Sequence, residues 1–265
     1  MRALGLVAAG WIIAIAAWAT AEDFSDQFKQ ANRLTIDLGV YGWEVLSSGK
    51  IGFPSRVDGA DNTVDFREDL SFRPAAGVPI GKVHLFLSDR WLLRFEYWQK
   101  QEEAQGKLPR SFVFDTTRFA EGESVESSLT AWNADLIAGY EIPLKRNLDI
   151  SLAGGINVFS FNQEVSGKSG TGDFSLTQTS PLLGLAGEYA FSSRISIWSC
   201  SMGYFQQGLN MKNYVLRTDT ALLVRVFHTA RLAVGYKSFW FATKDSADSL
   251  TYRQMGPYAG LSVAF

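Results

Sequence analysis

Apolar and polar residues alternate with a period of two through most of this chain. Near its start, Leu34, Ile36, Leu38 and Val40 share one parity, and polar or small residues take the other. Because successive side chains of a strand point to opposite faces, this pattern predicts strands with one apolar and one polar face. After the first 21 residues no apolar run reaches 18 residues, so the sequence predicts no transmembrane helix there.

About ten such stretches follow one another, which predicts an all-β, antiparallel, up-and-down barrel. The expected strands are 34–47, 78–87, 91–101, 125–142, 148–164, 174–191, 194–206, 214–227, 231–243 and 250–265. Eight or twelve strands stay open, because the long connections 48–77 and 102–122 hold strand-like pieces at 63–70 and 111–115. Poor alternation around Trp198 and Tyr204 suggests a β-bulge there.

The connections are expected to alternate in length. Those after even-numbered strands are very short, whereas those after odd-numbered strands are longer, including a Gly/Ser loop at 166–172. If both chain ends are periplasmic, the short connections are periplasmic turns and the long ones extracellular loops. This is the pattern of bacterial outer-membrane barrels.

The first 21 residues form a separate segment. Arg2 supplies a positive charge, the stretch from Leu4 to Trp18 is almost wholly apolar, and Ala19-Thr20-Ala21 has the form that signal peptidase cleaves. The apolar run is shorter than the ~20 residues that a spanning helix needs. The sequence therefore predicts a signal peptide over 1–21 and one barrel domain over 22–265.

Alternation alone does not say which barrel face is apolar, because a lipocalin-like barrel is apolar inside. The chain length, the expected loop asymmetry and aromatic residues at strand ends favour a barrel whose apolar face contacts lipid. An aromatic content of 14% fits rings placed at a lipid interface. The strand-end aromatic residues are Trp91, Tyr140, Tyr189, Phe191, Phe227 and Phe265.

With the apolar parity outward, charged residues of both signs face the lumen. The predicted interior charges are Asp37, Arg94, Glu96, Asp135, Glu141, Arg217, Asp219, Arg225, Arg231 and Lys237, together with Lys82, His84, Asp149 and Glu188. A barrel of this size has room for side chains and little more, which favours a lumen filled by ion pairs. A charge-lined pore stays open as the alternative, although selective pores usually carry an excess of one sign.

The sequence offers little for catalysis or cofactor binding. His84 and His228 lie close to or in short turns expected at the periplasmic end, whereas an outer-membrane hydrolase needs its base at the extracellular rim. Cys200 is the single cysteine, so no internal disulfide forms. The acidic residues between Asp58 and Asp69 lack the spacing of a calcium loop. We expect no enzyme, no cofactor and no metal site.

The formal net charge of −2, without a clustered basic face, predicts no binding of nucleic acid. The signal peptide, the alternating strands, the loop asymmetry and the terminal aromatic residue resemble the small outer-membrane β-barrel proteins of Gram-negative bacteria, the OmpA-, OmpW- and opacity-protein-like class.

This resemblance implies an outer-membrane location, contact with outer-membrane lipid and lipopolysaccharide, and recognition of the last strand by the barrel assembly machinery. The expected assembly signal is Tyr258, Leu261, Val263 and Phe265. A structural or surface-interaction role with an unknown extracellular ligand is expected first. A narrow channel for small solutes is the alternative, and a lipid- or peptide-hydrolysing enzyme is the weakest option.

Overall fold

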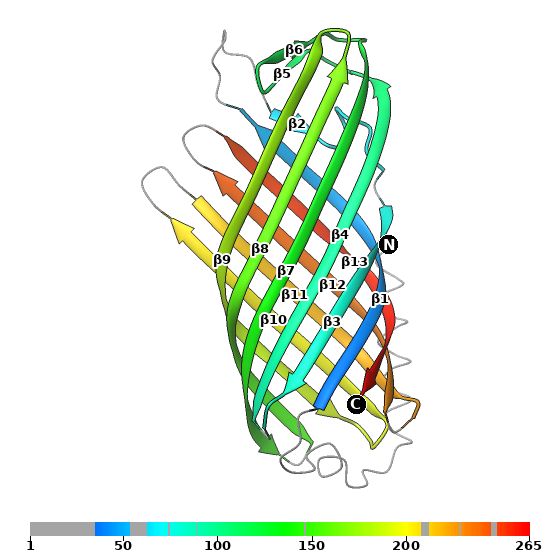
Figure 1. Cartoon of the computed structure of the whole chain (residues 1–265), viewed down its shortest axis with the longest axis vertical. Coiled ribbons are helices and arrows are strands. Elements are labelled where there is room, and N and C mark those ends of the chain that lie inside the picture. The colour runs from blue at the N-terminus through cyan, green and yellow to red at the C-terminus, as the bar shows by residue number, and fades with distance from the viewer. Residues whose placement is uncertain are drawn as a thin grey trace.

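Ten antiparallel strands close into one barrel in the computed structural model (Figure 1). The structure describes residues 35–53, 63–73, 75–88, 90–145, 147–207, 212–227, 229–244 and 248–265. The barrel strands are β1 (Thr35–Gly52), β3 (Ala75–Phe86), β4 (Trp91–Lys107), β7 (Ser124–Lys145), β8 (Leu148–Gly167), β9 (Gly170–Ala190), β10 (Ile195–Gln207), β11 (Lys212–Arg225), β12 (Ala230–Lys244) and β13 (Ser249–Ala264). Pairing of β13 with β1 closes the ring.

The expected barrel of ten strands is confirmed. Three short strands lie outside its ring: β2 (Thr63–Asp65), β5 (Phe112–Phe114) and β6 (Thr117–Phe119). β2 pairs with the end of β1, and β5 pairs with β6. The two strand-like pieces in the long connections therefore add no barrel strands. Among the described residues no helix is long and apolar enough to cross a membrane.

The expected loop asymmetry holds for only two connections. Long segments join β1 to β3 and β4 to β7, but Lys168 and Ser169 alone join β8 to β9. The predicted Gly/Ser loop at 166–172 is wrong, because the β8–β9 ladder continues up to Gly167 and Gly170. Gly170 has a φ of 131°, which a glycine adopts without strain. The two long connections still mark one end of the barrel as extracellular.

The predicted bulge around Trp198 and Tyr204 is also wrong. β10 pairs with β11 through an unbroken register from Ile195 to Gln207. Alternation looks poor in the sequence because Ser199 and Ser201 occupy the exposed face, where apolar residues were expected. The described ladders shift register instead between Pro143 and Lys145, at the end of β7.

The exterior of the barrel carries a belt of exposed apolar side chains. Val40 is 73% exposed and Leu183 is 75% exposed. Others in this lipid-facing belt are Leu38, Leu136, Leu152, Ile156, Leu185, Leu216, Leu232, Val234 and Leu261. Such a continuous apolar band is costly in water and is what the hydrocarbon core of a membrane requires. The apolar parity therefore faces outward, as expected.

Strands β4, β7, β8 and β9 rise well above the rest of the barrel (Figure 1). β7, β8 and β9 have 22, 20 and 21 residues, although about 9–11 suffice to cross a bilayer. Together with β2 and the β5–β6 hairpin, their upper ends form what we call the surface cap. The buried apolar side chains of the cap are continuous with those of the lumen; they are Phe66, Leu70, Phe72, Leu108, Phe112, Phe114, Phe119 and Phe174, with the partly buried Phe53 packed against them.

Candidate functional site

Six charged side chains meet in the middle of the lumen. This ion cluster consists of Lys82, Glu96, Asp135, Arg217, Asp219 and Lys237, each at most 6% exposed. Arg217 forms ion pairs with both Asp135 and Glu96, and its Nη2 atom lies 3.1 Å from Glu96 Oε2. Lys237 also pairs with Glu96. The cluster therefore holds three cations and three anions that cross-link opposite walls of the barrel.

Neutral groups add further polar contacts to the cluster. Lys82 Nζ lies 2.9 Å from Asp219 Oδ2, and the Tyr258 hydroxyl donates to Asp219 Oδ1 at 2.5 Å. Asn157 donates to Asp135 at 2.6 Å. The Lys82 ammonium also lies 4.7 Å from the centre of the Tyr41 ring. Such pairing is what buried charges require, because an unpaired charge in this environment is strongly unfavourable.

Aromatic rings fill the lumen on the extracellular side of the ion cluster. This aromatic layer consists of Trp43, Trp98, Phe159, Phe161, Phe239, Phe241 and Tyr252, all at most 1% exposed. Trp98 meets Trp43 edge to face at 5.9 Å and Phe239 at 5.4 Å, measured between ring centres. Phe159 lies 4.5 Å from Phe241. Lys237 Nζ, 5.7 Å from the Trp43 ring, connects this layer to the ion cluster.

Sequence reasoning missed the aromatic layer because it assigned aromatic residues to the lipid interface. The available signal was parity: Trp98 continues the inward face of Glu96, and Phe159 continues that of Asn157. Some aromatic residues do lie where expected. Trp91 and Phe227 are exposed at the ends of their strands, near the short turns.

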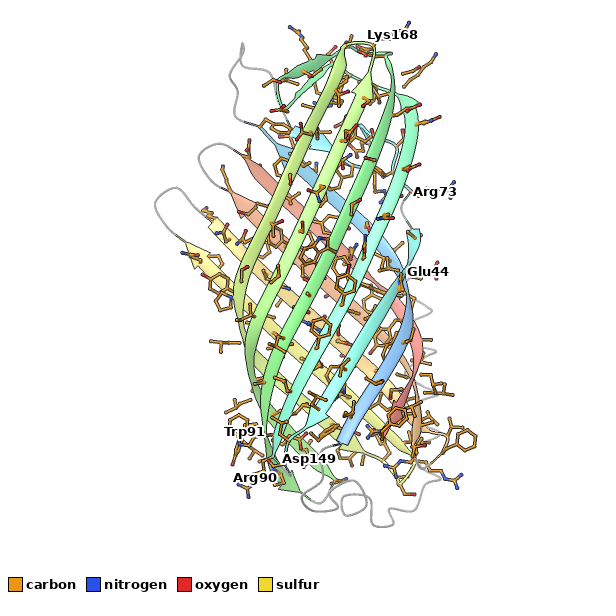
Figure 2. All side chains as sticks on the ribbon, in the orientation of Figure 1. Glu44, Arg73, Arg90, Trp91, Asp149 and Lys168 are labelled. Carbon is orange, nitrogen blue, oxygen red and sulfur yellow. The ribbon has the colours of Figure 1, made fainter. Side chains whose placement is uncertain are left out.

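A cavity of about 120 Å³ separates the ion cluster from the short turns. Seven of the predicted interior residues line it: Lys82, His84, Arg94, Glu141, Asp149, Glu188 and Arg231. Figure 2 shows Asp149 at this end of the barrel, the same end as Arg90 and Trp91, whereas Lys168 lies at the other end, at the tip of the cap. The buried Arg94 places its Nη2 atom 3.8 Å from Cys200 Sγ. Arg225 is half-buried at the end of β11.

Two predicted residues have no described side chain. The Asp37 backbone pairs in register with His84 and Ala264, but the Asp37 side chain lies outside the described part of the chain. His228 lies outside it as well.

The predicted assembly-signal residues divide between the two faces of β13. Leu261 and Phe265 are exposed on the outer face, whereas Tyr258 points into the lumen and Val263 is half-buried. Among described residues, no three His, Cys, Asp or Glu side chains are arranged to hold a metal ion.

No protein-family model and no curated protein sequence matches the chain. Among solved structures, it is similar to the outer membrane protease OmpT from Escherichia coli, with a TM-score of 0.60 and 11% identity over 89% of this chain and 100% of that one. The translocator domain of the autotransporter NalP from Neisseria meningitidis gives a TM-score of 0.45 at 8% identity, over 91% of this chain and 92% of that one.

At 11% identity the likeness to OmpT concerns the fold alone. Together with the closed ring of strands and the lipid-facing belt, it defines the chain as a small outer-membrane β-barrel protein.

Proposed function

We propose that this protein is a closed, non-conducting barrel that contacts other molecules at the cell surface through its cap. The filled lumen is the observation that carries this proposal. Arg217, Lys237 and Trp98 are each at most 1% exposed, and they occupy the height at which a permeating solute would have to pass. We further propose that the lipid-facing belt contacts outer-membrane lipid and lipopolysaccharide.

The construction of the cap supports a role at the surface. Arg110 on the β4–β7 connection donates to Asp69 on the β1–β3 connection, with Nη2 2.7 Å from Oδ2. Ser169, at the tip of the β8–β9 hairpin, donates its hydroxyl to Glu123 at 2.7 Å. Residues of the two long connections are thus held in fixed positions by one another and by the barrel wall. Pre-ordered surface groups lose less conformational entropy when they bind a partner.

Conductance of the refolded barrel in planar bilayers tests the closed lumen. We expect no stepwise conductance, with a general diffusion porin in the same bilayers as positive control. A second protein lacking residues 108–123 removes the β5–β6 hairpin and leaves the ion cluster and aromatic layer in place. It should stay closed as well, because the proposed block lies inside the lumen.

Stable stepwise conductance of the full-length barrel would support the narrow channel instead. Conductance only after removal of 108–123 would mean that the cap, and not the lumen, blocks passage. The protease named among the similar structures suggests hydrolysis as another candidate. His84 lies in the cavity near the short turns, at the end of the barrel opposite the cap, and we propose no such activity.

A further inference from the structure

The pairing between β9 and β10 stops part of the way up the barrel wall. Its last pair is Leu183 with Gly203, and no described residue continues the β10 side of β9 from Gly170 to Leu182 as a ladder. β10 continues to Gln207, but paired only with β11. Figure 1 shows β9 rising toward the cap while β10 and β11 end lower and lean away.

Pro181 explains why the pairing between β9 and β10 ends above Leu183. Ala190 donates its N–H to Asn147 on the β8 side, whereas Phe191 donates to Ile195 on the β10 side. Because donors alternate along a strand, odd-numbered residues of β9 point toward β10. Pro181, the next odd residue above Leu183, has no N–H to give, so the ladder ends there.

The unpaired edge lies above the membrane. Leu183 and Leu185 belong to the lipid-facing belt, whereas the outer-face residues Ser175, Thr177 and Thr179 are polar and exposed. An unpaired edge inside the hydrocarbon core would leave backbone groups unsatisfied, but above it water satisfies them. At its top the edge is occupied, because the Thr117 hydroxyl donates to the Thr171 carbonyl at 2.8 Å.

We propose that the β9 edge between Asp173 and Thr179 binds an extended peptide segment of another molecule as an added antiparallel strand. This proposal rests on the surface-interaction role and names the class of partner. The free N–H and C=O groups of alternate residues supply the ladder, as in other cases of strand addition. An added strand also completes the edge, which is otherwise open to unspecific pairing.

The faces of β9 define the chemistry of that segment. Phe174 and Leu176 point inward, and Phe174 lies 6.0 Å from Phe53 and 6.2 Å from Phe161 between ring centres. A neighbouring strand would continue this apolar surface on its inner side. On its outer side it would lie beside Ser175 and Thr177. The fitting segment therefore alternates apolar and polar residues and contains no proline over about six positions.

A second copy in the same membrane does not fit this edge. Two such barrels would be related by an axis along the membrane normal. Strands of outer-membrane barrels tilt by about 40° from that normal, so the two β9 edges would cross at roughly 80° and form no ladder.

A peptide with the sequence of residues 155–167 is a suitable probe. This segment of β8 pairs antiparallel with 170–182 on the other side of β9, so its alternation suits both faces. We expect a fluorescein-labelled copy to bind the refolded full-length protein in an anisotropy titration. Thr177→Pro removes one edge N–H and should weaken binding about tenfold. Thr177→Ala keeps that N–H and should bind within about twofold of the unmodified protein.

Amide hydrogen exchange provides an independent readout. The N–H groups of Ser175, Thr177 and Thr179 should exchange fast and those of Leu176 and Gln178 slowly. A variant in which residues 54–62 are replaced by a short Gly/Ser linker tests whether the chain covers its own edge. Coverage by the chain would give slow exchange at all of these amides in the unmodified protein and fast exchange at Ser175, Thr177 and Thr179 in the variant. That result would overturn the proposal, as would no peptide binding, or equal binding by the Pro and Ala variants. None of these three results affects the conductance test, which alone decides whether the lumen is closed.

Discussion

Arg217 on β11 and Glu96 on β4 meet across the lumen, with Arg217 Nη2 3.1 Å from Glu96 Oε2. Glu96 is also within ion-pair distance of Lys82 and Lys237, so one carboxylate serves three cations. A buried ion pair adds little net stability over an apolar replacement, but loss of one partner leaves an uncompensated charge. This asymmetry makes Glu96 the most sensitive position of the ion cluster.

We therefore predict that Glu96→Gln destabilises the barrel by about 3–5 kcal/mol, because it preserves side-chain shape and removes the shared charge. The measurement is the urea midpoint of the refolded protein, followed by the shift between folded and unfolded bands on gels. Glu103→Gln, at an exposed position of β4, is the matched control and should change the midpoint little. Equal midpoints for the two variants would contradict the role given to the cluster.

Gly256 on β13 lies directly against the β1 backbone at Glu44. A Cβ at this position would clash with the carbonyl oxygen of Glu44, and the Gly256 carbonyl accepts a bond from Trp43 Nε1 at 3.1 Å. Gly256→Ala should therefore strain the closing seam and cost about 1–3 kcal/mol. Gly42→Ala is the control, because nothing lies within 4 Å of its Cβ position. If both variants refold to the same yield and stability, the seam tolerates a side chain and this prediction fails.

We predict that the contacts of Glu123 in the cap weaken at acidic pH. Hydrogen bonds from the Ser169 hydroxyl and from the backbone N–H groups of Ser169 and Ala120 lower the pKa of the Glu123 carboxyl below its usual value of about 4.5. A lowered folded-state pKa contributes stability above the unfolded pKa and loses it as pH falls through the folded pKa. The protection factor of the Ser169 amide, relative to the intrinsic exchange rate at each pH, should thus fall as the pH drops below the usual carboxyl pKa of about 4.5. Glu123→Gln should show faster exchange already at neutral pH, and a pH-independent difference between the two proteins would contradict this.

Phe265 ends the closing strand, and its backbone pairs with Ile36 on β1, with N to O distances of 2.9 and 3.3 Å. Its side chain is 75% exposed at the periplasmic end of the lipid-facing surface. We predict that Phe265→Asp lowers the amount of assembled barrel in the outer membrane several-fold, since a charge on the lipid-facing surface opposes insertion. The expected recognition of the last strand by the assembly machinery would add to this effect. Thr116→Asp, in the exposed β5–β6 turn, should assemble normally. Normal outer-membrane levels of the Phe265→Asp variant would contradict the predicted role of the last strand in assembly.

The period-two alternation predicted the ten-stranded barrel and which side chains share a face of each strand. Chain length, the expected loop asymmetry and the strand-end aromatic residues were needed to say which face contacts lipid. Parity is a local property, because every second side chain lies on the same face whatever the strand pairs with. For the same reason, parity placed Glu96, Asp135 and Arg217 on the lumen side of their strands, which is where the structure has them.

Parity contains no information on height along the barrel or on partners across it. The contact between Arg217 and Glu96 joins residues 121 positions apart, and it depends on the register of every strand between them. The same holds for Trp98 and Phe239, whose rings meet only after the barrel has closed. The division of the lumen into an ion cluster and an aromatic layer was therefore decided by the tertiary structure.

Local sequence preference gave a wrong prediction for one connection. Glycine and serine at 166–172 suggested a loop, but pairing between β8 and β9 holds all of these residues except Lys168 and Ser169 in strands, because cross-strand bonds outweigh weak local preference. The sequence by itself determined where the strands lie along the chain and which side chains share a face. Only the tertiary structure decided which strands continue past the membrane, which charges pair and where an edge stays open, because each depends on contacts between residues distant in the chain.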